Sequence, residues 1–431
     1  MHRTSTRRRL SEERKQDASI LVCTTATPSV ILIIPFFRLI DWTKKKITMR
    51  HPMRLFKGLY FVQNGPFHST TNVLDGRGHV TCVHLYDGFV SEAFVPPVDH
   101  AVGLSDLSEH PWRTVWKAIF AGDRLHGGVS NTAVVHERNW YAVEEASHRY
   151  KLDFEGDGLV GTGSFEKVMM SPHANDCRYH YLATRPLPLQ IDGVSVPWTP
   201  RPRPFAIHSC ACAINYVVFP IMATCFGRYG AWVLRKIPLP LQIYHSGWLV
   251  YDTSSGKVSE VRCQQATDVF HIAKVTYRDN HLAIFASHVH NFAEFVSAPT
   301  SVAPNITFEK HVVCLDTHVV RERVVYTDAA GDFPNPMSQD LVLMNTMKDT
   351  ERGTSLVVFD TKAERKVRCV QLFHNTTDVL CLDDRRLIYA TLDEVVIYDW
   401  KAKRIFKRFA IPRRARNFHA SLLSTPIRDE K

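Results

Sequence analysis

From about residue 55 onward, short apolar runs of strand length alternate with polar turns. The runs are rich in β-branched and aromatic residues, which favour strands, and the clearest are Val217–Phe219, Leu249–Tyr251, Leu356–Phe359 and Val395–Tyr398. Apolar faces with the 3.6-residue period of a helix are scarce, although Pro111–Phe120 could form a short helix. The pattern therefore predicts an all-β fold.

The last hundred residues repeat one order of elements: a strand, an aspartate, a charged turn and a second strand. Leu356–Val370 and Glu394–Phe409 both follow this order, with Asp360 and Asp399 at the start of the turns. Short antiparallel strands repeated over most of a 431-residue chain are typical of a β-propeller or a large β-sandwich. No WD dipeptide recurs at a fixed period, which argues against a WD40 propeller.

The net charge of the chain is concentrated near its N-terminus. The sequence contains 53 Lys and Arg against 43 Asp and Glu, a formal net charge of +10, and a surplus of seven falls within residues 1–50. Because the rest is nearly neutral, it offers no basic face, and we expect no nucleic-acid partner. We therefore divide the chain into an N-terminal extension, residues 1–50, and a single all-β domain, residues 51–431.

Within the N-terminal extension, Arg7–Arg9 and Lys44–Lys46 flank an uncharged stretch from Ala18 to Phe37. These 20 residues are long enough to cross a bilayer, but two prolines interrupt them. A membrane anchor, an organelle-targeting segment and a disordered extension all remain open.

Three smaller motifs have ordinary explanations. Ten cysteines are scattered without a CxxC pair, which fits a reducing, intracellular compartment and argues against a structural zinc cluster. Gly156–Gly161 matches the dinucleotide pattern GxGxxG, but no βαβ unit surrounds it, so we interpret it as a glycine-rich turn. His288 and His290 would share one face of a strand, a geometry that metals can use, although such a pair arises easily by chance among 22 histidines.

Four other histidines lie in strand-like surroundings far apart in the chain. They occur in Ser171–Asp176, His208–Pro220, Phe270–Lys274 and Ile411–Ala420. In this order, the four stretches resemble the metal-ligand motifs of the carotenoid cleavage oxygenases. Four further stretches resemble landmarks of the same family in the same order, so that the resemblance covers about residues 55–425: Gly58–Pro66, Leu74–His79, Asn131–Ala133 and Ala142–Tyr150.

Similarity to this family implies a seven-bladed β-propeller with one Fe(II) ion per chain on its axis. It implies that four histidines are the metal ligands and the catalytic residues: His173, His208, His271 and His419. Neutral imidazoles suit ferrous iron, and four of them leave coordination positions open for O2. The family also places carboxylates on the outer N–H groups of these histidines, which would fix the ring directions. The matching positions here are Glu145, Asp332 and Asp378.

The chain departs from the family pattern at several of these positions. Asp332 stands where the family usually has Glu, and Asp378 falls in a shortened region. Ser209 replaces the Asp that follows the second histidine, and Lys274 replaces the Asn of the third stretch. Because all four ligand positions keep histidine, the sequence supports metal binding more firmly than it supports the catalytic rate of the family.

The implied function is oxidative cleavage, by a dioxygenase, of a conjugated C=C bond in a carotenoid, apocarotenoid or related polyene, with O2 as co-substrate and carbonyl products. A non-catalytic propeller that binds an apolar ligand and a retinoid-type isomerase or hydrolase remain alternatives. Since such substrates reside in lipid, we expect a peripheral membrane protein, in a plastid, a mitochondrion or the cytoplasm. Trp232–Leu249 is the candidate for its exposed apolar rim.

Overall fold

The computed structural model is built almost entirely of strands, as the sequence pattern predicts. The N-terminal extension, Pro111–Phe120 and the other gaps between the described ranges lie outside the part of the chain that the structure describes. The described residues are 56, 58–66, 78–94, 101–102, 126–127, 132–136, 140–144, 149–155, 158–166, 173–174, 179–180, 190–191, 194–196, 198, 208–226, 241–297, 304–346, 354–372, 376, 378–412 and 419–424.

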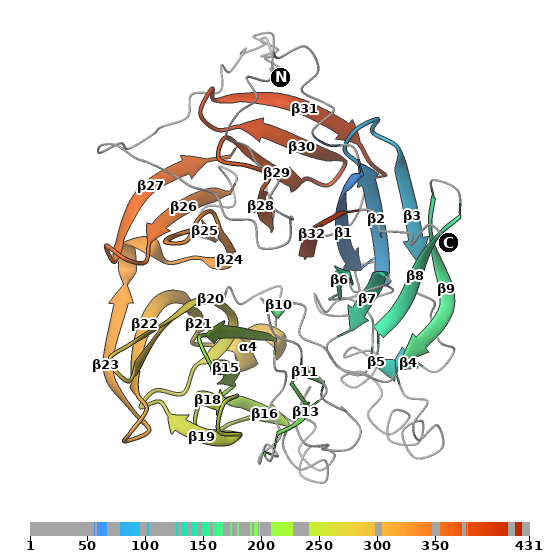
Figure 1. Ribbon diagram of the computed structural model, residues 1–431. Helices are drawn as coiled ribbons and strands as arrows, with labels where there is room; N and C mark the ends of the chain where they lie inside the picture. The colour runs from blue at the N-terminus through green and yellow to red at the C-terminus, as the bar shows by residue number, and fades with distance from the viewer. Residues whose placement is uncertain are drawn as a thin grey trace, which may run out of the picture.

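Among the described residues, six sheets of four or five strands are arranged in a ring (Figure 1), and all pairings within them are antiparallel except that of β10 with β14. Their strands are β1 (Leu59–Pro66), β2 (Gly78–His84), β3 (Val90–Phe94) and β32 (His419–Ser424); β6 (Thr132–His136), β7 (Trp140–Glu144), β8 (Arg149–Glu155) and β9 (Gly158–Glu166); β10 (His173–Ala174), β14 (Ser209–Ala213), β15 (Tyr216–Ile221), β18 (Gly247–Asp252) and β19 (Lys257–Arg262); β20 (Asp268–Arg278), β21 (His281–Val289), β22 (Ile306–Cys314) and β23 (Val319–Tyr326); β24 (Asp332–Pro336), β25 (Leu341–Thr346), β26 (Ser355–Asp360) and β27 (Arg365–Gln371); and β28 (Val379–Cys381), β29 (Arg386–Ala390), β30 (Glu394–Asp399) and β31 (Arg404–Ala410).

Smaller elements make up the rest of the described secondary structure. They are β4 (Ala101–Val102) with β5 (His126–Gly127); β11 (Tyr179–His180), β12 (Gln190–Ile191) and β13 (Val194–Ser195); β16 (Thr224–Phe226) with β17 (Leu241–Ile243); the helix α4 (Phe292–Ser297); and the 3₁₀ turn η3 (Thr327–Ala329). In the described part of the chain, no helix has the length and hydrophobicity needed to span a bilayer.

The burial of each strand follows its place in the sheet. The middle strands β15, β18, β26 and β30 are buried along almost their whole length, because both of their faces are covered. The outermost strands β19, β23, β27 and β31 are exposed or half-buried at nearly every position and carry Lys, Arg and Glu. Charged edge strands discourage pairing with other chains. This arrangement explains why apolar runs alternate with charged ones in the sequence.

The aspartates predicted to open turns do so. Asp360 Oδ1 accepts the backbone N–H groups of residues 362 and 363 at 2.9 and 2.8 Å, and Asp399 Oδ1 accepts that of Ala402 at 2.8 Å. Four residues after each aspartate, Glu364 and Lys403 adopt positive φ angles of 53° and 54°. The two hairpins therefore share one turn geometry, in which a non-glycine residue takes a left-handed conformation.

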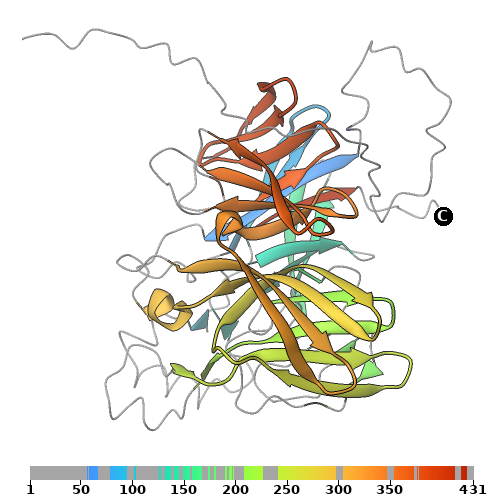
Figure 2. The same cartoon turned by 90° about the vertical axis from the view of Figure 1, so that its left-hand side faces the viewer.

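Neighbouring sheets pack face to face. Around the ring, the β6–β9 sheet is followed by the sheet of β1–β3 and β32, then by the β28–β31, β24–β27, β20–β23 and β14–β19 sheets. An apolar cluster lies between each consecutive pair. Figure 2 shows several of these sheets as successive layers. The ring depends on a long-range pairing, because β32 pairs antiparallel with β1, and His419 lies opposite Asn64. The all-β, propeller-type prediction is confirmed, whereas the count of seven blades stays a prediction.

The cysteines agree only in part with the expectation of free thiols. Seven of the described cysteines are free, but Cys212 is disulfide-bonded, which the scattered spacing did not predict.

Candidate metal centre

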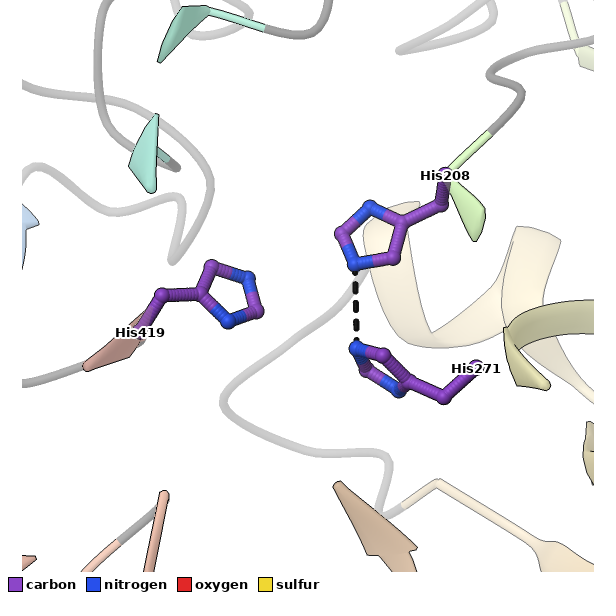
Figure 3. A group of neighbouring side chains, drawn as sticks. All are labelled: His208, His271 and His419. Carbon is purple, nitrogen blue, oxygen red and sulfur yellow. Dashed lines mark hydrogen bonds between the residues drawn. The ribbon is translucent and has the colours of Figure 1, made fainter. Parts of the chain in front are cut away.

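Three of the four predicted ligand histidines lie close together in the interior of the protein. His208 immediately precedes β14, His271 lies in β20, and His419 is the first residue of β32. Their side chains are buried, and one nitrogen of each lies within 4.8 Å of a nitrogen of each of the others. Figure 3 shows the rings of His208 and His271 directed toward each other, with His419 facing them from the opposite side. The Nε2 atoms of His208 and His271 are 3.0 Å apart.

Carboxylates face the outer nitrogens of two of these rings. Asp332 Oδ1 lies 2.6 Å from Nδ1 of His271, and because a carboxylate only accepts, Nδ1 carries the proton and Nε2 keeps its lone pair. Asp378 Oδ2 lies 3.4 Å from Nδ1 of His419 and accepts the backbone N–H of Ala420 at 2.8 Å. The two aspartates thus lie where the sequence resemblance expects outer carboxylates.

The electrostatics of the cluster favour a neutral His208 near a charged Asp332. Burial, together with the nearby rings of His271 and His419, holds the pKa of His208 well below its usual value. Burial alone would raise the pKa of Asp332, but the adjacent and hydrogen-bonded His271 lowers it below its usual value. Neutral imidazole nitrogens are metal ligands, whereas protonated ones are not.

The donor set fits a divalent first-row metal. Two imidazole nitrogens bound at right angles to one ion, each about 2.1 Å from it, are about 3.0 Å apart. The Nε2 atoms of His208 and His271 have this separation and are hydrogen-bonded to each other, with the lone pair of His271 Nε2 as the acceptor. A carboxylate on the outer nitrogen of a ligand histidine is the usual second partner in metal sites.

The other two predicted residues are only partly covered by the structure. His173 begins β10, and its backbone pairs in parallel with Ser209, next to His208. The side chain of His173 and the whole of Glu145 lie outside the described residues. Their roles as fourth ligand and outer carboxylate remain predictions.

Aromatic rings that the sequence analysis did not single out pack on the histidines. The ring of Phe270 lies 5.3 Å from that of His208, and the ring of Phe333 lies 4.9 Å from His271 and 5.7 Å from His419. Phe292, in α4, packs on Phe270 at 4.5 Å. Their position in the sequence could have identified two of them, since Phe270 precedes His271 and Phe333 follows Asp332.

Two departures from the family pattern have clear structural consequences. Lys274 Nζ donates to Asp340 Oδ1 at 2.9 Å and to Thr361 Oγ1 at 3.0 Å, so its side chain links β20 to the neighbouring β24–β27 sheet. Ser209 Oγ accepts the backbone N–H of Ile272 at 3.1 Å. Both residues therefore connect neighbouring sheets.

A second buried group contains His288, Glu309 and His311, whose ligand atoms lie within 4.8 Å of one another. Its carboxylate already accepts four hydrogen bonds: two from Arg323 at 2.7 Å, one from Thr307 at 2.7 Å and one from His311 at 3.0 Å. Four is about the capacity of a carboxylate. Burial alone would raise the pKa of Glu309, but the bonds from His311 and Arg323 lower it.

The histidines of this second group are also engaged. Trp248 Nε1 donates to Nδ1 of His311 at 3.1 Å, so the proton of a neutral His311 ring sits on Nε2 and bonds Glu309. Burial lowers the pKa of His288 to about 3, and its Nδ1 bonds Thr267 at 2.9 Å. The group is therefore held in an extensive hydrogen-bond network, and Nε2 of His290, the predicted partner of His288, lies 3.6 Å from Oε1 of Glu309.

The predicted apolar rim at Trp232–Leu249 is wrong at its C-terminal end. Trp248 and Leu249 belong to β18 and are fully buried, Trp248 against the neighbouring β20–β23 sheet and Leu249 in a cluster with Val196. Ile243 and Tyr244 are exposed, at 65% and 38%. Residues 232–240 lie outside the described part of the chain.

No protein-family model and no curated protein sequence matches the chain. Solved structures do. The cobalt-substituted apocarotenoid oxygenase of Synechocystis matches with a TM-score of 0.61 and 13% identity, over 86% of this chain and 93% of that one. The lignostilbene dioxygenase of Pseudomonas brassicacearum matches with a TM-score of 0.61 and 14% identity, over 86% and 92%. The resemblance that the motifs indicate is therefore confirmed in the architecture: the chain has the fold of the carotenoid cleavage oxygenases.

Proposed function

We propose that this chain is an iron-dependent oxygenase that uses O2 to cleave a conjugated C=C bond of a carotenoid, apocarotenoid or related polyene, giving carbonyl products. One observation carries the proposal. His208, His271 and His419 converge in the interior of a fold shared with two oxygenases, and Asp332 and Asp378 face their outer nitrogens. A buried set of neutral imidazoles with outer carboxylates is suited to a ferrous ion.

In this proposal, one Fe(II) per chain lies on the axis of a seven-bladed propeller and is held by His173, His208, His271 and His419. When bound, ferrous iron supplies the chemistry that activates O2 beside the substrate alkene. Asp332 keeps the proton of His271 on Nδ1, so that Nε2 remains available as a donor atom. Phe270 and Phe333 form an apolar wall on the histidines, which would exclude water and pack against a polyene.

The proposal includes a membrane surface as the source of substrate, because long polyenes are nearly insoluble in water. The exposed Ile243 and Tyr244 and the basic N-terminal extension would make the contact. We therefore propose a peripheral membrane protein inside the cell, without choosing between an organelle and the cytoplasm.

Metal analysis and oxygen-dependent turnover test this function together. Protein purified from iron-replete cells should contain close to one iron per chain, and His271→Ala should lose most of it. His281→Ala is the matched control, since His281 lies in the adjacent strand β21 and bonds only the carbonyl of Asp279 among its described partners. Wild-type protein without iron would overturn the proposed metal site.

The same protein is then incubated with a panel of carotenoids, apocarotenoids and stilbenes, in air and without oxygen. Loss of polyene absorbance coupled to O2 uptake supports cleavage. Binding without bleaching would instead indicate a non-catalytic binding protein. Product formation without O2 would indicate an isomerase or hydrolase.

A further inference from the structure

His271 lies between two serine hydroxyls that tie its surroundings to neighbouring strands. On one side, Ser209 Oγ accepts the backbone N–H of Ile272 at 3.1 Å. On the other side, Ser287 Oγ donates to the backbone carbonyl of Gly331 at 2.9 Å. Both serines are fully buried, so neither bond competes with water.

The Ser209 bond joins the strands that carry two of the histidines. Ser209 is adjacent to His208 in the chain, and Ile272 is adjacent to His271. The bond therefore connects the backbones beside the two rings whose Nε2 atoms are 3.0 Å apart. A shift of β14 relative to β20 would have to break it.

The Ser287 bond reaches the backbone beside the carboxylate that faces His271. Ser287 lies directly opposite His271 in the pairing of β21 with β20. It binds the carbonyl of Gly331, and the next residue, Asp332, accepts the Nδ1 proton of His271 at 2.6 Å. The contacts therefore run from the backbone of His271 through Ser287 and Gly331 to Asp332, which bonds the ring of His271.

The backbone around Asp332 has an unusual course that brings the short side chain close to His271. A Cβ atom at Gly331 would lie 2.6 Å from the carbonyl oxygen of Asn345, so only glycine fits against β25 there. Phe333 has a φ of +52°, and the pairing of β24 with β25 is irregular between Asp332 and Asn335. Such a conformation persists only where its surroundings hold it.

We propose that Ser209 and Ser287 are positioning residues that fix the direction of the His271 Nε2 lone pair, and that the tethered backbone at Gly331 lets the short Asp332 serve where a longer glutamate would otherwise be needed. The inference rests on the proposed metal site, since that site gives the direction of Nε2 its importance. It concerns residues of this chain and predicts an effect that can be measured in the absence of metal. Loosening either tether should change the Nδ1–H hydrogen bond of His271.

The test uses Ser209→Ala and Ser287→Ala in the full chain. Ser246→Ala is the matched control, because Ser246 is also buried and donates to a backbone carbonyl, that of Gln265 at 2.7 Å, but does not contact the three histidines. The first measurement is made without metal, on protein labelled with ¹⁵N-histidine. The Nδ1–H signal of His271, assigned by its loss in Asp332→Ala, should shift and exchange faster with solvent in both serine variants and stay unchanged in Ser246→Ala.

The second measurement is Co2+ binding, followed by competition with a chelator and by the visible spectrum of the bound ion. Each serine variant should bind Co2+ about 10-fold more weakly or worse, the effect typical of outer groups in metal sites, with an altered spectrum. Asp332→Glu should also weaken binding, because the added methylene overshoots a carboxylate position set by the backbone.

Serine variants whose His271 signal and Co2+ affinity equal those of Ser246→Ala would overturn the inference, and so would tighter binding by Asp332→Glu. Failure of the wild-type protein to bind Co2+ would count against the proposed function instead. In that case the metal-free signal of His271 still decides whether the serines position the ring.

Discussion

Asp268, the first residue of β20, provides a quantitative test of how the strand that carries His271 is anchored. Its side chain is only 4% exposed; Oδ1 accepts the backbone N–H of Thr224 at 2.8 Å, and Oδ2 accepts the Thr224 hydroxyl at 2.7 Å. Burial raises the pKa of Asp268 from 3.8 to about 6, even though these hydrogen bonds favour the charged form. At neutral pH the folded protein therefore holds a carboxylate in an unfavourable environment.

The raised pKa makes folding stability depend on pH in a defined direction. Because the folded state binds this proton more tightly than the unfolded state, the contribution of Asp268 to stability increases as the pH falls through about 6 toward 3.8. Between about pH 7.5 and about pH 5, this single group should add about 1.4 kcal/mol to the free energy of unfolding. Asp268→Asn keeps an acceptor for the Thr224 N–H and a partner for its hydroxyl, but does not titrate.

The assay is urea unfolding of wild-type and Asp268→Asn protein at both pH values, followed by tryptophan fluorescence. Comparison at the same pH cancels the contributions of all other titrating groups. The free energy of unfolding of the variant minus that of wild type should be about 1.4 kcal/mol larger at the higher pH than at the lower. A stability difference that is the same at both pH values would refute the reasoning, because Asp268 would then have equal pKa values in the two states.

Three further predictions concern the metal, a turn and the membrane. Asp332→Asn keeps an acceptor for His271 but removes the charge, so metal affinity in a chelator competition should fall about 10- to 100-fold; unchanged affinity would exclude this carboxylate as a partner of the site. Lys403→Gly relieves a left-handed backbone at φ 54° and should raise the free energy of unfolding by up to about 1 kcal/mol, whereas Ala402→Gly should lower it; equal effects would contradict the turn geometry. In liposome sedimentation, a chain that begins at Met49 should still bind vesicles, more weakly than the full chain; a wholly soluble truncated chain would place the contact in the N-terminal extension alone.

The strands and turns were predictable because their signals are local. The apolar runs at Leu356–Phe359 and Val395–Tyr398 form β26 and β30, and Asp360 and Asp399 open the turns that follow them. In each case the residue types and their immediate neighbours determine the conformation. The histidine motifs were also recognisable, because their order along the chain reflects the order of the sheets around the ring.

Features set by contacts between sheets could not be predicted in the same way. Trp248 lies in a segment whose apolar, proline-containing sequence favoured an exposed rim, but the neighbouring β20–β23 sheet covers it. The reach of Asp332 likewise depends on the backbone at Gly331 and Phe333, which the change from Glu to Asp does not reveal. In a single sequence, such distant contacts are reflected only at positions that require glycine or an aromatic residue. The reason for that requirement becomes visible only in the three-dimensional structure.

The pairing of β32 with β1 links the assembly of the three-histidine cluster to the order in which the chain is synthesised. His419 begins β32, more than three hundred residues after β1, and it joins His208 and His271 only when the two strands pair. While the chain is still emerging from the ribosome, its earlier sheets can fold, yet the third imidazole is missing. At the proposed metal site, the three imidazoles therefore come together only after β32 has been made and has paired with β1, and an ion bound there would stabilise this long-range pairing against opening.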